Sequence, residues 1–416
     1  MKRKILAIAL SLAAGACLAL GLTGCGGSSI ELVFELNEET DTYTVFAADD
    51  SKSGKKAVIP SSYEGKPVTA IGEGAFEQCY ELKTVTIPDS ITTIGESAFD
   101  YCISLKNVTI PDSVTSIGDR AFFNCYELTS ITIPQNLTKI GRFAFSQCSD
   151  VESITVATGN PAYYSAGNCL IVTEKKELIA GCKNSVIPSG VTLIGDHAFA
   201  HCDIASVNFP DSVTSIGEYA FSACYALTGI NLPDGITSIG RNAFEFCDIP
   251  DVSIPATVTF IGEQAFYTCR KVESITVAQG NPVYHSADNC LIETATNKLL
   301  AGCMNSVIPD SVTAIGDYAF YACFGLRKID IPDSVITIGK SAFAGCIALR
   351  KVEIGKGVTS IGEEAFKYCD EFGKITFRGT TSEWKAITKG EGWRKYTDFL
   401  SSVECTDGTL TEDDIG

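Results

Sequence analysis

A motif of 23 residues repeats along most of this 416-residue chain and limits the folds that are open to it. One copy is LKNVTIPDSVTSIGDRAFFNCYE, residues 105–127, and the next copy begins at once with Leu128. Glycine, phenylalanine and cysteine each recur at a fixed position, in columns of eleven from Gly72, Phe76 and Cys79 onward. A period of 20–30 residues with apolar residues at fixed positions is typical of a solenoid, in which each copy forms one turn of a coil.

Each copy is predicted to contain one strand, a short extended return segment and one helical turn. Apolar residues alternate with polar ones over 105–110, as in a strand with one buried face, and Pro111 ends this strand because proline has no N–H to donate. Gly118 then lets the backbone turn where a Cβ would be unwelcome, and Asp119 suits the N-cap of a helical turn over 119–125. The pattern therefore predicts an α/β repeat solenoid.

The regular copies occupy only part of the chain, and the remaining segments divide it. Near its start, ELVFEL and TYTVFA flank a polar NEETD and predict a β-hairpin, and both tryptophans lie near its end. Two long insertions resemble each other and make the array a repeat of three blocks. The predicted segments are an N-terminal cap at 30–70, an array at 71–373 with insertions near 156–185 and 277–306, a C-terminal cap at 374–405 and a tail at 406–416.

The eighteen cysteines allow two interpretations. The column cysteines point the same way from neighbouring turns, so they are predicted to be free thiols in a stacked core. Each insertion reads as a β-hairpin. If each hairpin has a two-residue turn, its two cysteines face each other and become disulfide candidates, the alternative being packed thiols. These candidate pairs are Cys169 with Cys182 and Cys290 with Cys303.

The N-terminus reads as an export signal. Three basic residues at 2–4 precede an apolar run over 5–20, and the junction Leu-Thr-Gly-Cys ends at Cys25. This junction resembles the lipobox of bacterial lipoproteins, which implies cleavage after residue 24, a lipid on Cys25 and a tether at 25–29. An ordinary secretory signal cut near the same place is the alternative. The expected location is the bacterial cell envelope, lipid-anchored and surface-exposed.

Composition excludes several classes of function. The formal net charge is −18, and residues 1–24 contribute positive charge only, so the exported part is more acidic still. Such a surface argues against nucleic acid as a partner and against broad docking on anionic lipid, which leaves the N-terminal lipid as the only predicted membrane contact.

No catalytic or metal-binding pattern emerges from the sequence. His197 and His201 lie near Cys202 and superficially suggest a metal site, but matched positions in other copies hold other residues, such as Tyr219 and Ala223. The two histidines are therefore interpreted as incidental surface residues. Serine and glycine are explained by turns, so the chain is predicted to be no enzyme and to carry no cofactor.

The outward positions of the strands form the predicted binding surface. A ladder of hydroxyl and amide side chains on a rigid sheet suits a protein or glycan ligand, although threonine is also simply a good strand residue. The third block adds a basic cluster beside two acids. The candidate residues are Thr86, Thr109, Thr132, Asn208 and Asn231 in the ladder, and Arg327, Lys328, Arg350 and Lys351 with Asp330 and Glu353 in the third block.

The units LTSITIPQNLTKIGRFAFSQC and LRKIDIPDSVITIGKSAFAGC resemble the BspA-like, or Treponema pallidum-type, leucine-rich repeats of bacterial surface proteins. The resemblance covers about residues 57–405. It implies a curved, right-handed leucine-rich-repeat coil whose LxxVxIP strands form a parallel β-sheet on one face. The family has no general catalytic motif. For function it implies protein recognition or adhesion, with a host matrix protein or another cell-surface protein as partner. The alternative is an envelope lipoprotein that captures glycans.

Overall fold

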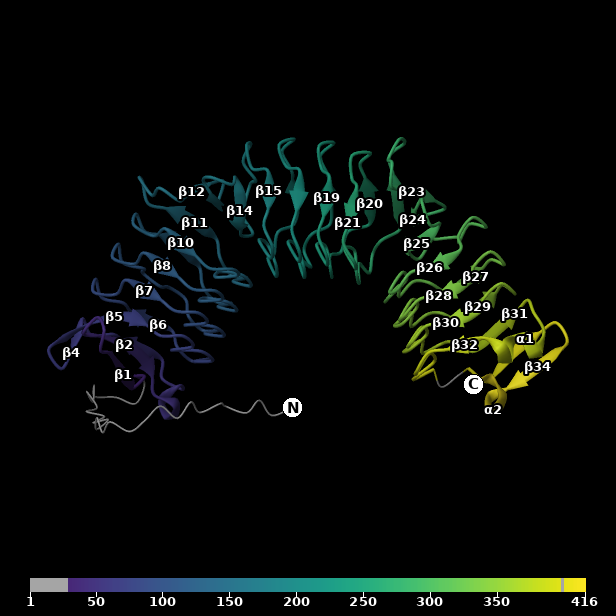
Figure 1. The fold of residues 1–416 in the computed structure, drawn as a ribbon, viewed down its shortest axis with the longest axis horizontal. Helices are drawn as coiled ribbons and strands as arrows, with labels where there is room; N and C mark the ends of the chain where they lie inside the picture. Colours follow the sequence, from purple (N-terminus) through teal and green to yellow (C-terminus); the bar gives the residue numbers. More distant parts are fainter. Residues whose placement is uncertain (1–28, 398–399) are drawn as a thin grey trace.

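The computed structural model describes residues 29–397 and 400–416 and shows a coil that curves into an open arch, with β1 (Leu32–Asn37) at one foot of the arch and the C-terminal elements at the other (Figure 1). The described α-helices are two short ones near the C-terminal end, α1 (Thr381–Ala386) and α2 (Glu412–Ile415). The chain is therefore a β-solenoid, which confirms the predicted repeat solenoid but not the helical part of its rungs. Within the described part, no helix is both long and apolar enough to cross a membrane.

The predicted signal peptide over 1–24 and the lipidation residue Cys25 lie outside the described residues. The same holds for the predicted tether at 25–29, apart from Ser29. All three therefore stay predictions.

Each turn of the coil, called a rung here, begins with a first strand that contains the LxxVxIP residues. First strands of neighbouring rungs pair in parallel and in register, for example Thr132 with Thr155, which confirms the predicted parallel pairing. The pairing is not continuous, because it forms four two-stranded sheets and one five-stranded sheet, and Asn107 makes only an isolated bridge with Thr84. The first strands are β3 (Lys56–Val58), β6 (Thr84–Thr86), β9 (Ser130–Ile133), β11 (Ser153–Val156), β16 (Val207–Asn208), β18 (Ile230–Asn231), β20 (Asp251–Ile254), β22 (Ser274–Val277), β27 (Lys328–Ile331), β29 (Lys351–Ile354) and β31 (Lys374–Phe377).

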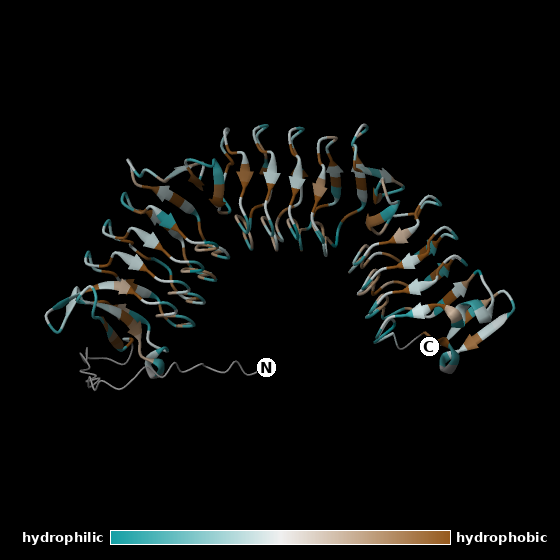
Figure 2. Cartoon of the chain, viewed as in Figure 1, coloured by the Kyte–Doolittle hydropathy of each residue, from teal (hydrophilic) through white to brown (hydrophobic). Residues whose placement is uncertain are grey.

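A second strand follows in most rungs, at the Thr-Ser-Ile-Gly residues. These strands are mostly two residues long, and they pair in parallel into three longer sheets. They are β5 (Lys66–Ile71), β7 (Thr93–Ile94), β8 (Ser116–Ile117), β10 (Lys139–Ile140), β15 (Leu193–Ile194), β17 (Ser215–Ile216), β19 (Ser238–Ile239), β21 (Phe260–Ile261), β26 (Ala314–Ile315), β28 (Thr337–Ile338), β30 (Ser360–Ile361) and β32 (Thr388–Lys389). Figure 2 shows hydrophobic residues on the strands and hydrophilic ones at many of the loops.

The glycine column allows the rungs to approach each other closely after the second strand. A Cβ added to Gly118 would lie 2.4 Å from the backbone nitrogen of Glu96, one rung earlier. None of the eleven column glycines has a positive φ, so close approach rather than a left-handed turn explains them. The acidic residue after the glycine binds the next rung, because Asp119 Oδ1 accepts a hydrogen bond from the backbone N–H of Arg142 at 2.9 Å. The predicted N-cap role of Asp119 is therefore wrong.

The third segment of each rung is a ribbon of turns and not the predicted helical turn. In the prototype rung, Arg120 and Asn124 have φ of 55° and 59°, which a right-handed helix does not contain. Alternate amides bond within the rung and across to the next one. The amide of Cys102 donates to Phe99 O at 3.1 Å, and the amide of Phe99 donates to Ala121 O at 2.7 Å in the following rung. The third segment therefore adds a further set of hydrogen bonds between rungs.

The phenylalanine and cysteine columns form the centre of the core. Phe99 and Phe122 stack with ring centroids 5.1 Å apart, and both side chains are fully buried. The Cys102 thiol donates to Phe76 O at 3.1 Å, and the Cys125 thiol donates to Phe99 O at 3.3 Å. Cysteine suits this position because it is small and apolar and has a weak donor for a carbonyl one rung away. All the described column cysteines are free, which confirms that part of the prediction.

We expect the column thiols to resist iodoacetamide in the native protein. Burial raises the pKa of Cys148 and Cys247 to about 12, and the thiolate is the reactive form. Intact-mass measurement without reductant should show little labelling of the column at about pH 8 and full labelling in guanidinium. Rapid native labelling of the column, or a mass deficit from disulfides, would contradict the buried thiol arrangement.

Each insertion contains three antiparallel strands that form a partition across the coil. In the first insertion, Leu170 and Ala180 pack on the preceding core, while Ile171 and Leu178 pack on the following one. The partitions are β12 (Tyr163–Ala166), β13 (Cys169–Val172) and β14 (Glu177–Ala180), and β23 (Tyr284–Ala287), β24 (Cys290–Glu293) and β25 (Lys298–Ala301).

The predicted pairing of the insertion cysteines is wrong. Val172 pairs with Glu177 around a four-residue turn, and a bulge between Leu170 and Ile171 shifts the register again. Cys169 lies opposite Ala166 of β12 rather than opposite a cysteine, and the second insertion repeats this arrangement. The side chains of Cys169, Cys182, Cys290 and Cys303 are buried free thiols.

The partitions divide the coil into three stacks, defined here as residues 29–156, 163–277 and 284–416, and the buried core divides into three clusters at the same places. The first stack begins with its own antiparallel pair, β1 (Leu32–Asn37) and β2 (Thr42–Ala47), and β2 pairs in parallel with β5 just as β14 pairs with β15. Strand β4 (Ser62–Tyr63) pairs antiparallel with the beginning of β5. The three stacks therefore share one plan, a hairpin followed by rungs.

The C-terminal end of the third stack is closed by aromatic residues. Trp384 on α1 is fully buried and contacts Phe377 and Trp393, with ring centroids at 5.4 and 6.1 Å. Strands β33 (Ser402–Cys405) and β34 (Gly408–Thr411) extend the last sheet, and Ile415 is buried. The interpretation of 406–416 as a frayed tail is therefore wrong.

Candidate recognition surfaces

The predicted ladder of outward side chains is exposed but divided. Thr86, Thr109, Thr132, Asn208 and Asn231 are all exposed. The structure brings Asn208 beside Asn231, and Thr132 beside Thr155 with their hydroxyls 3.3 Å apart. Because these pairs belong to separate short sheets, they do not form one continuous surface.

The third stack carries the longest sheet of first strands, and this sheet is charged. Its strands run in the order β27-β29-β31-β33-β34. Lys328, Lys351 and Lys374 are in register along it. Asp330 and Glu353 form a second, acidic row beside them. The structure therefore brings together the predicted third-block residues on one sheet, which we call the charged face.

Arg378 organises the acidic row, and the sequence analysis missed it. Its Nη2 lies 2.5 Å from Asp330 Oδ1 and 3.5 Å from Glu353 Oε2. Lys351 also pairs with Glu353 at 2.7 Å, and this bond and the nearby Arg378 lower the pKa of Glu353. The sequence signal for this role was an arginine directly after the predicted strand that became β31. From there its side chain reaches Asp330, which lies two rungs earlier.

The basic cluster is unevenly neutralised. Arg350 pairs with Glu371 at 2.6 Å, and Lys374 pairs with Glu404. Arg327 and Lys328 are exposed and make no salt bridge within the described residues. These two cations are the part of the charged face that is most open to an acidic partner.

A second candidate surface lies at the second junction, where β23–β25 separate the second and third stacks. The phenylalanine stack is interrupted there. Phe266 stacks on Phe244 at 5.6 Å, whereas Phe320 packs against Gly302, where an added Cβ would lie 2.1 Å from its ring. The edge of β21 is capped by a side chain, because Ile261 donates its N–H to the Tyr284 hydroxyl at 3.0 Å.

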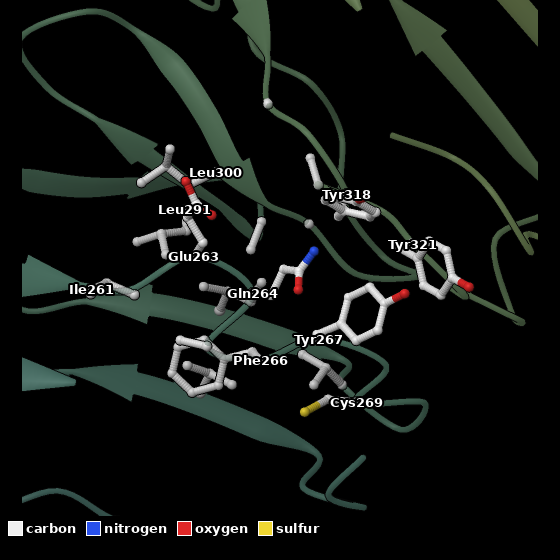
Figure 3. A pocket seen from close by; sticks show the side chains of 18 of the residues that line it. Ile261, Glu263, Gln264, Phe266, Tyr267, Cys269, Leu291, Leu300, Tyr318 and Tyr321 are labelled. Atoms are coloured by element: carbon white, nitrogen blue, oxygen red, sulfur yellow. The ribbon is translucent and has the colours of Figure 1, made fainter. Parts of the chain in front are cut away.

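This interruption leaves a pocket of about 220 Å³ (Figure 3). Its apolar wall includes Ile261, Phe266, Leu291 and Leu300, and Tyr267 and Tyr321 lie at one side. The two tyrosine rings stack at 4.4 Å. Burial and the Tyr321 hydroxyl raise the pKa of Tyr267, so its hydroxyl remains protonated. The polar lining consists of Glu263, Gln264, Thr268, Lys298, Asp317 and Tyr318.

The first junction has an equivalent pocket of about 270 Å³ with different chemistry. Arg142 and Asp196 line it and lie 3.5 Å apart, and Lys175 lies 3.9 Å from Glu177. Its charged groups therefore have partners within the protein. Aromatic rings of Phe143, His197 and Tyr219 pack together at its rim.

His197 is the centre of that stack, so its interpretation as an incidental surface residue is wrong. Its ring contacts Phe143 at 4.5 Å and Tyr219 at 4.8 Å between centroids. Burial lowers the pKa of His197 to about 4, helped by Arg120 and Arg142 and opposed by Asp196. The ring is therefore a neutral packing group at neutral pH.

We expect His197 to make stability fall in mild acid. Above its ordinary pKa of 6.5 the ring is neutral in both states, and between 6.5 and about 4 only the unfolded chain binds the proton. The free energy of unfolding should therefore drop by about 2 kcal/mol between about pH 7.5 and 5 through this residue. Urea unfolding should show a smaller drop in the free energy of unfolding for His197→Tyr. Tyrosine is chosen because Tyr318 holds the matched position in the third stack. An equal drop in both proteins would contradict this role.

The described residues contain no group of three or more histidine, cysteine, aspartate or glutamate side chains placed to hold a metal ion. The two surfaces consist instead of charged and aromatic groups, which suit noncovalent binding. These features define the class of the protein, a repeat solenoid with its candidate sites on the strand face and between stacks.

The sequence comparison identifies the family. The model of the BspA type leucine rich repeat region matches in six copies, over residues 65–169, 192–299 and 297–388. The chain therefore belongs to the BspA-type leucine-rich-repeat family, as the sequence resemblance predicted. A comparison with curated proteins gives no significant match.

Several solved structures are similar to this chain. A leucine rich cell surface protein from Faecalibacterium prausnitzii is 27% identical, with a TM-score of 0.50, over 92% of this chain and 94% of that chain. A leucine-rich repeat protein from Eubacterium ventriosum is 19% identical, with a TM-score of 0.49, over 91% and 97%. The T. pallidum leucine rich repeat protein is 24% identical, with a TM-score of 0.33, over 57% and 86%.

Proposed function

We propose that this protein is a lipid-anchored scaffold on the bacterial surface that recognises or adheres to another protein and performs no catalysis. The family and the F. prausnitzii relative, described as a cell surface protein, support the location. The partner is a host matrix protein or another cell-surface protein. The charged face of the third stack is the observation that supports protein recognition most directly.

The charged face has features that folding alone does not require. Like charges directly opposite each other destabilise a sheet, yet Lys328, Lys351 and Lys374 occupy adjacent strands in register. The positions matched to these lysines in the first stack hold uncharged residues such as Asn107 and Ser130. Arg327 and Lys328 make no salt bridge within the described residues, so an acidic patch on another protein would complement them.

The test is binding by residues 26–416 to a panel of host matrix and cell-surface proteins, measured by surface plasmon resonance. Reversing the charge of Arg327, Lys328, Arg350 and Lys351 should weaken binding at least about tenfold and reduce its salt dependence. Lys83→Glu with Lys106→Glu is the matched control, because these lysines hold the same positions in the first stack as Arg327 and Arg350. Unchanged binding by the fourfold variant would reject the charged face as the site.

The lipid anchor requires a separate test, since Cys25 lies outside the described residues. Two acyl chains are enough for stable membrane attachment. We expect the mature protein to partition into the detergent phase of Triton X-114 and Cys25→Ala to partition into the aqueous phase. Aqueous partitioning of both proteins would reject lipidation.

A further inference from the structure

We propose that the pocket at the second junction binds a single neutral sugar residue, as the end of a glycan or as a free monosaccharide. This site is distinct from the charged face and does not depend on the protein-binding function. The inference follows from the size of the pocket, its aromatic surfaces, its polar groups and one buried hydroxyl.

The size and wall of the pocket suit one small ring. Its volume of about 220 Å³ is below the ~300 Å³ at which pockets for drug-sized ligands begin. Phe266 has a stacking partner on its Phe244 side and faces the pocket with the rest of its ring. Tyr267 and Tyr321 add a second aromatic surface with hydroxyl groups (Figure 3). Aromatic faces of this kind accept the C–H face of a sugar ring.

The polar groups favour a polyhydroxyl ligand over a purely apolar one. The lining contains the carboxylates of Glu263 and Asp317, the amide of Gln264 and the ammonium of Lys298. Glu263 and Lys298 make no salt bridge within the described residues, so both can bond to ligand hydroxyls. Two carboxylates against one ammonium disfavour an acidic sugar, which is why the ligand should be neutral.

Thr268 is the most specific sign of a ligand. Thr268 lines the pocket and is only 6% exposed, and its buried hydroxyl has no hydrogen-bond partner within the described part of the chain. A buried hydroxyl without a partner costs free energy, so such groups are normally satisfied. Its φ of 56° is also unusual for a β-branched residue. The matched positions 223 and 322 hold alanine at φ of 57° and 53°, so the fold does not require threonine there.

The first junction supplies an internal comparison. It has the same interruption of the stack, but Ser146 replaces Tyr267 and Ala200 replaces Tyr321 in the matched positions. Its acidic and basic groups pair with each other, as Arg142 and Asp196 do. The second junction alone combines an open aromatic wall with unpaired polar groups among the described residues, so the two pockets differ in chemistry rather than in architecture.

The test is saturation-transfer NMR and calorimetry on the mature protein with methyl glycosides of neutral hexoses and N-acetylhexosamines. N-acetylneuraminic acid and p-cresol are the acidic and purely aromatic counter-probes. We expect saturable binding of at least one neutral glycoside and at least about tenfold weaker binding in Thr268→Ala and Tyr321→Ala. Thr268→Ser keeps the hydroxyl and should retain most of the affinity.

These variants distinguish the loss of the binding site from the loss of the folded structure. Alanine already occupies the position of Thr268 in other rungs and that of Tyr321 at the first junction, so both variants should keep the wild-type unfolding midpoint. Gln147→Ala, at the position of Thr268 in the first junction, should bind like the wild type. Absence of binding by every neutral glycoside would overturn the proposal. So would binding that Thr268→Ala and Tyr321→Ala leave unchanged, or binding of only the acidic or aromatic counter-probe.

Discussion

Replacing Gly240 by alanine is expected to lower the free energy of unfolding of the second stack by about 3 kcal/mol. A Cβ at this position would lie 2.5 Å from the carbonyl carbon of Gly217 and 2.6 Å from the backbone nitrogen of Glu218. Both atoms belong to the preceding rung, so relief of the clash separates two rungs and weakens the hydrogen bonds between them. Urea unfolding followed by circular dichroism measures the loss.

Gly229→Ala is the matched control for this substitution. Gly229 lies in the same stack, and a Cβ there would meet nothing within 4 Å. The control should change the free energy of unfolding by no more than about 0.5 kcal/mol. Equal stability of the two variants would show that the glycine column is not fixed by the contact between rungs.

Replacing Phe221 by alanine is expected to cost about 3–5 kcal/mol. The side chain is fully buried between Phe199 and Phe244, with ring centroids at 4.9 and 5.4 Å, and the edge of Phe209 closes the site. The cavity would interrupt the stack on both sides, and rungs are stabilised chiefly by their neighbours. The loss should appear as a lower urea midpoint for the second stack.

Tyr225→Ala provides the comparison for the phenylalanine column. Tyr225 is an aromatic residue in the same rung, but it is 57% exposed. Its replacement should cost less than about 1 kcal/mol. A Phe221→Ala protein as stable as Tyr225→Ala would contradict the view that stacked rings hold the rungs together.

The columns could be predicted from the sequence because each reflects a contact that recurs in every rung. Phe122 and Cys125 are buried for the same reason as their counterparts one period away, so repetition alone predicts a shared inward position. The outward position of Thr132 follows from strand alternation in the same way.

The third segment of the rung could not be predicted in this way. An alanine-phenylalanine pair followed three residues later by cysteine matches helical spacing, so local pattern favours a helical turn. The structure instead places Arg120 and Asn124 in left-handed conformations, and the amides of Arg120, Phe122 and Asn124 donate to carbonyls of the next rung. These bonds join residues more than twenty positions apart, which a local pattern does not contain.

The register of the hairpins was also predicted wrongly from the sequence. The expected two-residue turn at Lys175 places Cys169 opposite Cys182, but the bulge after Leu170 removes that symmetry. Both faces of the hairpin are buried, because each packs on a different core. Alternation therefore gives no signal for the register there.

Of the candidate sites, the charged residues were visible in the sequence and the pocket was not. Lys328 and Lys351 stand where the first stack has uncharged residues such as Asn107 and Ser130, which a repeat alignment reveals directly. The pocket exists because Phe266 has no stacking partner across the junction, a consequence of how the partition packs. Three tyrosines around the second insertion, Tyr267, Tyr318 and Tyr321, were the available signal.

The central claim is that partitions divide one coil into three stacks, each held by contacts between adjacent rungs. Hydrogen exchange read by mass spectrometry on the intact Phe221→Ala protein tests it most directly. Faster exchange should be confined to peptides within residues 163–277, with the rungs nearest Phe221 affected most and the other two stacks matching the wild type. Uniformly faster exchange from one end of the arch to the other would contradict the division into stacks.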